Sequence, residues 1–276
     1  MVTGGEVLAA ASWNTNADLL ADAVVPLGYL DPAADRVLDC TWGLGVWHNR
    51  FTVADLVACD IDPTKSPYGC SICERDADHP KVKNRPMHDG LPVDYRALPF
   101  ADCTFDVVMF DPAYVLQGGR ATSSIPDYNE RYGRHLTPSS PAALREDIAA
   151  GLAESHRVLR RGGRALVKCA NYVWSGRLVP GVAWTFEDAA AVGFEMVDWF
   201  THVGSVRAQP KNRTRKCGAC RGSGLCDWCG GSGRVASVQR HARQNSSALF
   251  VLRRTAAPPP QGSLFSPCGE TVDREC

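Results

Sequence analysis

The residues best suited to chemistry are Asp111, Pro112 and Tyr114, which directly follow the apolar run 105–110 (FDVVMF). An amino group on an aromatic base is a weak nucleophile because its lone pair is delocalised into the ring. The carboxylate of Asp111 and the main-chain carbonyl of Pro112 could each accept one N–H of such an amine. The nitrogen would then become pyramidal, with its lone pair directed at an electrophile. Tyr114 could stack on the face of the base.

The pattern therefore predicts a catalytic group made of Asp111, Pro112 and Tyr114. Proline favours this role because its φ is fixed and it has no N–H. The alternative is an ordinary exit from a strand, since Asp-Pro is a frequent start of turns.

A second group of reactive residues lies in two CxxCxGxG units, CGACRGSG and CDWCGGSG. Each CxxC turn offers two thiolates, and two such turns complete a tetrahedral site with four sulfur ligands, which suits zinc. The sequence therefore predicts a zinc site formed by Cys217, Cys220, Cys226 and Cys229. A redox-active pair is the alternative, but no thioredoxin-like context surrounds these cysteines.

The residues around these cysteines are basic. Segment 207–247 has nine Lys and Arg residues and one acid, Asp227, whereas the whole chain has 30 basic and 30 acidic residues. This concentration suits phosphate contacts, so we expect an inserted module that helps to hold nucleic acid. The alternative is a zinc-stabilised hairpin with a solvated basic surface. The basic residues are Arg207, Lys211, Arg213, Arg215, Lys216, Arg221, Arg234, Arg240 and Arg243.

Upstream, the stretch VLDCTWGLG places Asp39 at the end of an expected strand, followed by Gly43 and Gly45. Glycines let the backbone turn sharply and approach a ligand closely. The next expected strand ends at Asp60, where a carboxylate can bind both hydroxyls of a ribose. The dinucleotide fingerprint G-x-G-x-x-G is absent because His48 replaces its last glycine, which disfavours a dehydrogenase. Ordinary strand-to-helix turns are the alternative.

A further acid, Asp94, precedes the sequence Leu98-Pro99-Phe100. A carboxylate here could accept a hydrogen bond from the amino group of an adenine, with Leu98 and Phe100 as an apolar wall. Asp94 could equally be a solvated turn residue. Asp39, Asp60 and Asp94 follow one another along the chain in the order of the expected strands. We expect these three acids to line the carboxyl edge of an open α/β sheet.

The elements that position these residues alternate between strands and helices. We expect strands at 36–39, 55–60, 105–110, 164–169, 195–206 and 248–253, and helices at 139–160 and 186–192. This alternation predicts an α/β fold with a Rossmann-like, doubly wound, mostly parallel sheet. The last two strands have no clear helix between them, so we expect an antiparallel terminal hairpin with 207–247 inserted at its tip.

These expectations divide the chain into a main domain (1–206 and 248–255), an inserted zinc module (207–247) and a tail (256–276). The tail is rich in Pro, Gly and Ser, which predicts disorder. The N-terminal residues do not resemble a signal peptide, and no segment approaches the ~20 apolar residues that span a bilayer. We therefore expect a cytoplasmic location and no membrane association. The sequence makes no prediction about the oligomeric state.

In these motifs the sequence resembles class I S-adenosylmethionine-dependent methyltransferases. Within that class it is similar to the amino-methyltransferases of DNA and RNA, whose fourth strand ends in (Asn/Asp/Ser)-Pro-Pro-(Tyr/Phe). The resemblance covers roughly residues 37–168 and the final hairpin. It implies S-adenosylmethionine as cofactor, bound by the loop with Asp39, by Asp60 at the ribose and by Asp94 at the adenine. It also implies that Asp111 begins the catalytic tetrad.

The resemblance favours adenine N6 in DNA as the methylated atom, because enzymes for cytosine N4 usually have serine at the position of Asp111. RNA guanine-N2 enzymes more often have asparagine there. Two other interpretations stay open: an RNA base methyltransferase acting on guanine N2 or adenine N6, and a catalytically degenerate, zinc-containing nucleic-acid-binding protein. The last stays open because Ala113 replaces the second proline of the tetrad, and the cofactor loop also departs from the family, with TWGLG for Phe-x-Gly-x-Gly.

The cysteine units resemble the zinc repeats of the DnaJ chaperone family, which has four units and two zinc ions. Two units imply one zinc here. No other part of the sequence resembles a J-domain, so the resemblance does not extend to chaperone activity. Two more segments have open interpretations. Cys70, Cys73, His79 and His88 are either a second zinc site or ordinary thiols and surface histidines, and residues 115–138 are either a substrate-contacting lid or a surface loop.

Overall fold

The centre of the molecule is a six-stranded sheet with the order β2-β1-β3-β4-β10-β7. The computed structural model describes residues 13, 15–43, 45–61, 93–114, 138–174, 177–203, 213–224, 226–237 and 246–255. The strands are β1 (Arg36–Asp39), β2 (Asp55–Ala58), β3 (Phe105–Phe110), β4 (Leu159–Cys169), β7 (Phe194–Val203) and β10 (Ser246–Arg254). β1 is parallel to β2 and β3, and β3 is parallel to β4.

β10 is antiparallel to both of its neighbours, β4 and β7. The prediction of a mostly parallel α/β sheet with an antiparallel terminal hairpin is thereby confirmed. The six strands include edge and central positions, and the hydrophobic strands β3 and β4 occupy the centre, where both faces are covered.

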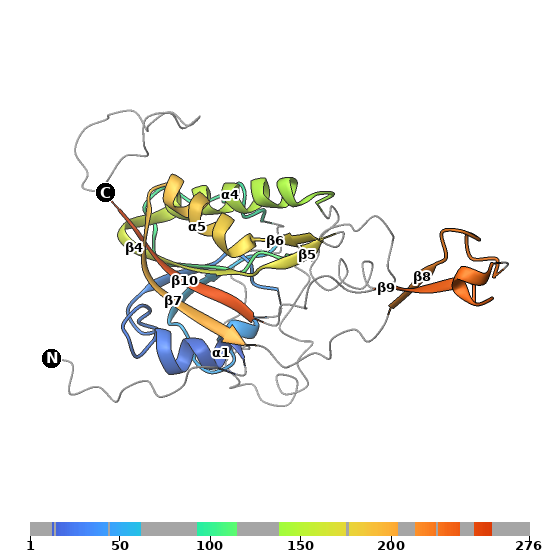
Figure 1. Ribbon diagram of the computed structural model, residues 1–276. Coiled ribbons are helices and arrows are strands. Elements are labelled where there is room, and N and C mark those ends of the chain that lie inside the picture. Colours follow the sequence, from blue (N-terminus) through green and yellow to red (C-terminus); the bar gives the residue numbers. More distant parts are fainter. Residues whose placement is uncertain are drawn as a thin grey trace.

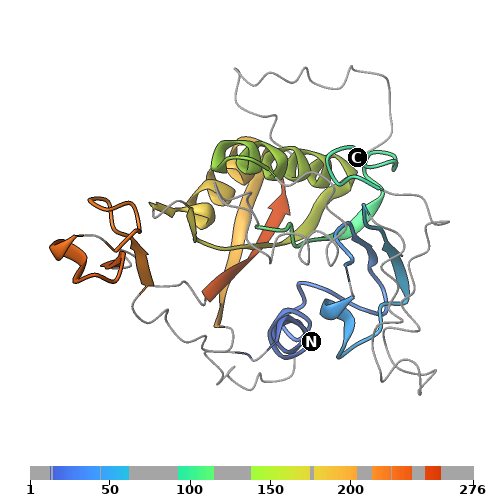
Figure 2. The ribbon, with the colours of Figure 1, turned by 90° about the vertical axis from the view of Figure 1, so that its right-hand side faces the viewer.

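Helices cover both faces of this sheet (Figure 1). On one face lie α4 (Pro141–Val158) and α5 (Gly181–Ala191), while α1 (Asn16–Leu19), the π-helical η1 (Leu20–Val24) and the 3-10 helix η2 (Val46–His48) belong to the other. Side chains alternate along a strand, so β3 contributes Phe110 to the layer under α4 and Met109 to the layer over α1. Figure 2 shows the sheet between α4 and α1 from a second side.

The strand order reverses direction between β1 and β3. β2 lies on one side of β1, whereas β3 and β4 follow on the other. In open α/β sheets, ligands bind at such a switch point, outside the carboxyl ends of the strands. These two carboxyl ends are Asp39 for β1 and Phe110, followed by Asp111, for β3.

Several element bounds differ from the prediction. β2 ends at Ala58, so that Asp60 lies beyond the strand. α4 ends at Val158 because Leu159 is already extended, with φ −70° and ψ 140°. The strand predicted to begin at residue 164 begins at Leu159, so that Gly162 and Gly163 lie inside the longer strand β4.

Helix α5 starts at Gly181, ahead of the predicted 186–192. No side chain of its own caps this start, but the Asn171 side chain accepts a hydrogen bond from the backbone N–H of Val182 at 3.1 Å. A cap supplied from outside the helix leaves no start signal at the expected position in the sequence. The small hairpin of β5 (Tyr172–Trp174) and β6 (Arg177–Val179) was not predicted.

The predicted zinc module contains a hairpin of its own, formed by β8 (Arg213–Lys216) and β9 (Arg234–Ser237), with the 3-10 helix η4 (Asp227–Cys229) between them. The division into domains stays a prediction. Cys70, Cys73, His79, His88, residues 115–137 and the tail 256–276 lie outside the described residues. None of the helices that the structure describes has the length and apolar character needed to cross a bilayer.

His156 on α4 predicts how stability depends on pH. Burial, and next the charge of Arg254, lower the pKa of His156 from 6.5 to about 4, while a backbone hydrogen bond with Gly193 acts in the opposite direction. The unfolded chain therefore gains this proton at a higher pH than the folded chain does. The stabilising contribution is complete above about pH 6.5 and is lost as the pH falls toward about 4.

Denaturant titrations at about pH 7 and about pH 5 measure this dependence. His156→Gln, which is neutral at both values, is expected to lose less stability on acidification than the unmodified protein. An equal loss in both proteins would contradict this assignment.

Candidate functional site

The loop after β1 is fastened to the end of β2. The backbone N–H of Gly43 donates to Oδ2 of Asp60 at 2.7 Å, and the N–H of Trp42 donates to the carbonyl of Cys59 at 3.1 Å. Gly43 and Gly45 have φ values of +53° and +60°. A Cβ at Gly45 would lie 2.5 Å from the ring of Trp42. The structure therefore brings Gly43, Gly45 and Asp60 together in the tight loop that the sequence predicts.

Asp39 stabilises this loop from within. Its carboxylate is buried, and Oδ1 accepts the N–H of Thr41 at 3.1 Å while Oδ2 lies 2.9 Å from Nε2 of His48. The His48 ring stacks on Trp42 with 5.1 Å between ring centroids. Both oxygens of Asp39 thus have partners inside the protein, and in this structure Asp39 shapes the loop. Its direct contact with a cofactor stays a prediction.

Asp111 is held at the end of β3 by three neighbours. Its backbone N–H donates to Oγ1 of Thr41 at 2.8 Å, which links the end of β3 to the loop after β1. Nε1 of Trp47 donates to Oδ2 of Asp111 at 3.0 Å, and Nζ of Lys168 lies 4.0 Å from the same oxygen. Lys168 in turn donates to Oδ1 of Asn16 at 2.8 Å.

The environment of Asp111 changes its acidity. Burial raises the pKa of Asp111 above its ordinary value, while the charge of Lys168 and the hydrogen bond from Trp47 act in the opposite direction. Burial is the largest effect, so the net shift is upward. A carboxyl with a raised pKa at the carboxyl edge of an α/β sheet is a candidate functional group.

Asp94 lies close to the loop, because the N–H of Val93 donates to the carbonyl of Asp60 at 2.9 Å. The Asp94 carboxylate forms an ion pair with Arg96 at 2.6 Å, and Arg96 also contacts Asp147 on α4 at 2.7 Å. This network fixes Asp94 at the surface beside the end of β2. Its contact with an adenine ring stays a prediction.

Leu98 and Phe100 belong to the core cluster beneath α4. Leu98 is buried, and its N–H donates to Glu154 at 2.8 Å. Phe100 is partly buried and packs edge-on against Phe105 with 5.2 Å between ring centroids. In this structure both side chains therefore support the segment that follows Asp94, and the apolar wall predicted from them stays a prediction.

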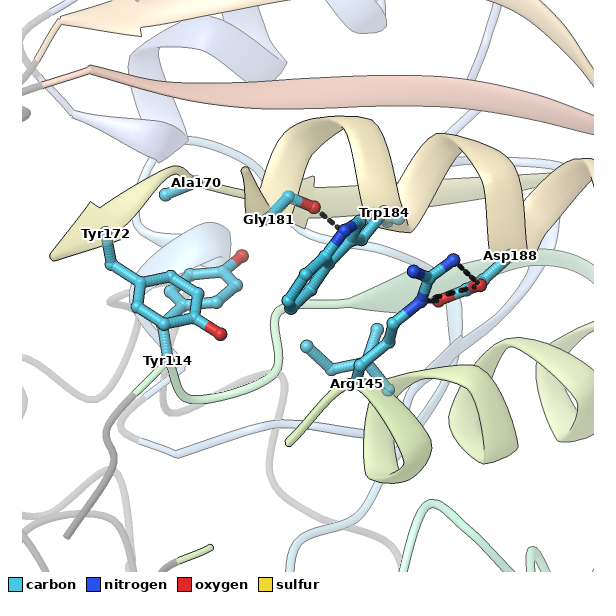
Figure 3. A pocket seen from close by; sticks show the side chains of 9 residues that line it. Tyr114, Arg145, Ala170, Tyr172, Gly181, Trp184 and Asp188 are labelled. Atoms are coloured by element: carbon cyan, nitrogen blue, oxygen red, sulfur yellow. Dashed lines mark hydrogen bonds and ion pairs between the residues drawn. The ribbon is translucent and has the colours of Figure 1, made fainter. Parts of the chain in front are cut away.

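Tyr114 turns toward the α4 and α5 layer. Its hydroxyl donates to the carbonyl of Lys168, and its ring packs against the core cluster of that layer. Together with Tyr172 and Trp184 it lines a hollow of about 280 Å³ that is open to solvent (Figure 3). On the other side of Trp184 in this view, Arg145 pairs with Asp188 at 2.7 Å. Three aromatic rings thus line one hollow next to the predicted catalytic group.

The four predicted metal ligands form a compact cluster. The Sγ atoms of Cys217, Cys220, Cys226 and Cys229 all lie within 4.8 Å of one another. Three of the separations are 3.5 Å (Cys217 to Cys226), 3.8 Å (Cys220 to Cys229) and 3.5 Å (Cys226 to Cys229). With Zn–S bonds of about 2.3 Å, sulfurs of a tetrahedral site lie roughly 3.8 Å apart. The cluster therefore fits one zinc ion.

Hydrogen bonds couple the thiols of this cluster. Desolvation raises the pKa of Cys220, but backbone hydrogen bonds with Gly222 and Gly224 and contacts with Cys217 and Cys226 together lower it to about 6. The same contacts have the opposite effect on Cys226, whose pKa is raised to about 12. Zinc binds thiolates, so binding of the ion would displace the proton that these thiols share.

Loss of one ligand should abolish the zinc site. Cys226→Ser is expected to remove bound zinc and to make the β8–β9 hairpin sensitive to protease, because small zinc-centred units depend on their metal for folding. Elemental analysis and limited proteolysis measure the two effects. Cys103→Ser, which changes a cysteine outside the cluster, is the control and should keep one zinc per chain. Retained zinc in Cys226→Ser would contradict the site.

Sequence reasoning missed five residues that hold Asp111 and Asp39: Asn16, Thr41, Trp47, His48 and Lys168. Trp47 and His48 immediately follow the glycine loop. Their ring nitrogens could have been recognised as hydrogen-bonding partners for the carboxylates of Asp39 and Asp111. Lys168 was detectable as the one charged residue in the apolar run ALVKC. Asn16 had no signal, because it meets Lys168 across 152 residues of chain.

Comparisons with known proteins give structural likenesses only. No family model matches the chain, and no curated protein does. The cyclase SpnF is similar with a TM-score of 0.45 and 16% identity, over 91% of this chain and 86% of that one. A candidate methyltransferase from Bacillus halodurans is similar with a TM-score of 0.43 and 15% identity, over 84% of this chain and 97% of that one.

A candidate DNA modification methylase from Thermus thermophilus has a TM-score of 0.31 and 15% identity, over 59% of this chain and 51% of that one. This chain therefore spans about half the length of that methylase. Likenesses at these identities concern the fold alone.

Proposed function

We propose that the protein is an S-adenosylmethionine-dependent methyltransferase that acts on the exocyclic amino group of a nucleic-acid base, with adenine N6 in DNA as the favoured target. One observation supports this most strongly. Asp111 lies at the carboxyl end of β3, beside the loop that joins Gly43 to Asp60. Thr41 accepts its backbone N–H and Trp47 donates to its carboxylate.

The loop after β1 fits the cofactor. Among the described residues, a Cβ at Gly43 would meet one atom, the Thr41 oxygen at 3.9 Å, so this part of the chain leaves the backbone open to close approach by a ligand. Asp60 would hold the ribose, and Asp94 would lie at the adenine. When bound, S-adenosylmethionine supplies an electrophilic methyl group. The acidic residues at this edge also suit a ligand with an ammonium and a sulfonium charge.

Asp111 would accept one N–H of the target amine, and the carbonyl of Pro112 would accept the other. Trp47 and Lys168 both contact Oδ2 of Asp111. Among the described residues no hydrogen bond or ion pair reaches Oδ1, which leaves this oxygen for the amine. Fixing the amine in this way localises its lone pair before reaction, and hydrogen-bond acceptors that are already in place cost no reorganisation.

The hollow next to Tyr114 supports a flat aromatic substrate. Tyr114, Tyr172 and Trp184 line it, and a base that lies against their exposed faces could stack there. Stacking on aromatic rings contributes about 1–3 kcal/mol per base and depends little on which base is bound. A duplex target would first have to be turned out of its stack. The aspartate at position 111 favours adenine within this class.

Transfer of a labelled methyl group to DNA and to RNA tests the proposal. The zinc-loaded protein is incubated with labelled S-adenosylmethionine and each polymer, and the retained label is counted. Label in DNA supports the proposal, whereas label in RNA alone would keep the reaction and replace the substrate. No label in either polymer, from protein that binds the cofactor, would overturn it.

The charge of Lys168 should set the acid limb of the pH profile. The ionised form of Asp111 is the one that accepts an N–H, and its pKa is already raised, so activity falls at a higher pH than an ordinary aspartate would give. Lys168→Met removes an effect that lowers this pKa, and the acid limb of kcat/KM should therefore move to higher pH. Lys168→Arg keeps the charge and should leave the limb near its original position. An unchanged limb in Lys168→Met would contradict this assignment.

A further inference from the structure

The positive charge of the chain is concentrated in the zinc module, residues 207–247. This module has nine of the 30 Lys and Arg residues and one of the 30 Asp and Glu residues, which leaves 21 basic and 29 acidic residues in the rest of the chain. A polyanion is attracted by the module and repelled by the remainder. By its charge, the module is therefore the part of the chain best suited to hold nucleic acid.

The module also exposes an aromatic ring. Trp228 is 65% exposed, the highest value among the large apolar side chains that the structure describes. It lies in η4, between the zinc ligands Cys226 and Cys229. Zinc bound by Cys226 and Cys229, which flank Trp228, would fix the backbone of Trp228. Its exposed ring would then be held in a defined position. The first CxxC unit has Ala219 at the corresponding position.

Exposed cations accompany this ring on the same small unit. Lys216, Arg221 and Arg234 are exposed, and Asp227 is the one acid of the module. An aromatic face combined with a basic surface is the arrangement that binds single-stranded nucleic acid, because bases stack on the ring and cations follow the backbone. Duplex bases already stack on one another and offer no open face.

We propose that Trp228 is a stacking platform for an unpaired base, and that Lys216, Arg221 and Arg234 contact the neighbouring phosphates. This inference rests on the proposed function for nucleic acid as the partner. It goes further by assigning single-stranded nucleic acid as the form that the module binds, and Trp228 as the residue that selects it.

Fluorescence anisotropy with the full-length, zinc-loaded protein tests this assignment. Labelled single-stranded DNA and the same sequence as a duplex are titrated at low and moderate salt, in the absence of S-adenosylmethionine. The variants are Trp228→Ala, Trp228→Phe and Trp199→Ala, which removes an exposed tryptophan (54%) from β7, outside the module. Zinc content is measured for each variant.

Trp228→Ala is expected to lose about tenfold or more of single-strand affinity, with little change for duplex, while Trp228→Phe keeps most of it because a phenyl ring still stacks. Trp199→Ala should bind as the unmodified protein does. Unchanged single-strand affinity in Trp228→Ala, or equal losses for single strand and duplex, would overturn the proposal. Absence of nucleic-acid binding at low salt would also overturn it and would point to a protein partner for Trp228.

The binding assay contains no cofactor, so a protein that fails to transfer methyl groups can still pass it. Conversely, if the binding assay overturns the role of Trp228, label transfer by Trp228→Ala at saturating DNA would show that the proposed function still stands. If Trp228→Ala loses zinc, tryptophan fluorescence of Trp228→Phe decides the question. A base stacked on Trp228 should quench the tryptophan emission of the unmodified protein when single-stranded DNA is added. Loss of this quenching in Trp228→Phe supports the platform, and unchanged quenching contradicts it.

Discussion

Asp111→Ala is expected to abolish detectable methyl transfer while leaving nucleic-acid affinity nearly unchanged. The variant removes the acceptor that would fix one N–H of the amine. Removing one preorganised hydrogen-bonding group from an active site typically lowers kcat by roughly 10²–10³-fold. Removal of the partly buried carboxylate relieves its desolvation cost, which offsets the loss of the hydrogen bond from the buried Trp47, so only a small change in stability is expected.

Asp111→Asn is the matched variant for this experiment. Its amide keeps one acceptor oxygen, so part of the activity should survive. Activity is measured as label transfer, affinity by anisotropy and stability by thermal unfolding. Measurable methylation by Asp111→Ala at a rate near that of the unmodified protein would exclude Asp111 as the catalytic acceptor.

Gly45→Ala is expected to destabilise the protein, whereas Gly43→Ala is expected to weaken cofactor binding. Both glycines have positive φ, and for alanine this backbone costs about 1–2 kcal/mol. At Gly45 a Cβ would also lie 2.5 Å from the Trp42 ring, and such overpacking adds about 1–3 kcal/mol. Gly45→Ala should therefore lower the free energy of unfolding by about 2–5 kcal/mol.

Gly43 has room for a Cβ within the protein, because the nearest atom would be 3.9 Å away. If that space is used by the cofactor, Gly43→Ala should keep most of its stability and lose about tenfold in affinity for S-adenosylmethionine, equivalent to ~1.4 kcal/mol. Denaturant unfolding and calorimetric titration of the cofactor separate the two effects. Equal effects of both variants on stability, with unchanged cofactor affinity, would contradict the assigned loop.

The positions of the main strands and the place of the carboxylates could be predicted because both depend on local patterns. Buried strands read as apolar runs, and the carboxyl ends of parallel neighbours meet at one edge of the sheet. Asp39 and Asp111 follow adjacent strands β1 and β3, so their proximity followed from the fold alone. The four cysteines were predictable for a similar reason, since their spacing defines the geometry of the cluster.

The partners of these carboxylates could not be predicted, because they meet across long stretches of chain. Trp47 reaches Asp111 across 64 residues, and Lys168 reaches Asn16 across 152. The packing of Leu98 and Phe100 against the core under α4 was likewise hidden, since an apolar residue beside an acid reads equally well as a ligand wall or as core. Helix α5 starts earlier than predicted. Its cap is Asn171, which lies ten residues before Gly181, the first residue of the helix, so no capping residue marks the start in the adjoining sequence.

The most direct test of the central claim is the identity of the methylated product. DNA incubated with the zinc-loaded protein and S-adenosylmethionine is digested to nucleosides and analysed by mass spectrometry, with Asp111→Ala in parallel. The account predicts N6-methyladenine with the unmodified protein and none with Asp111→Ala. A product methylated on a ring carbon, or the same product in equal amount from both proteins, would contradict the role of Asp111, because in neither case would Asp111 orient an exocyclic amine.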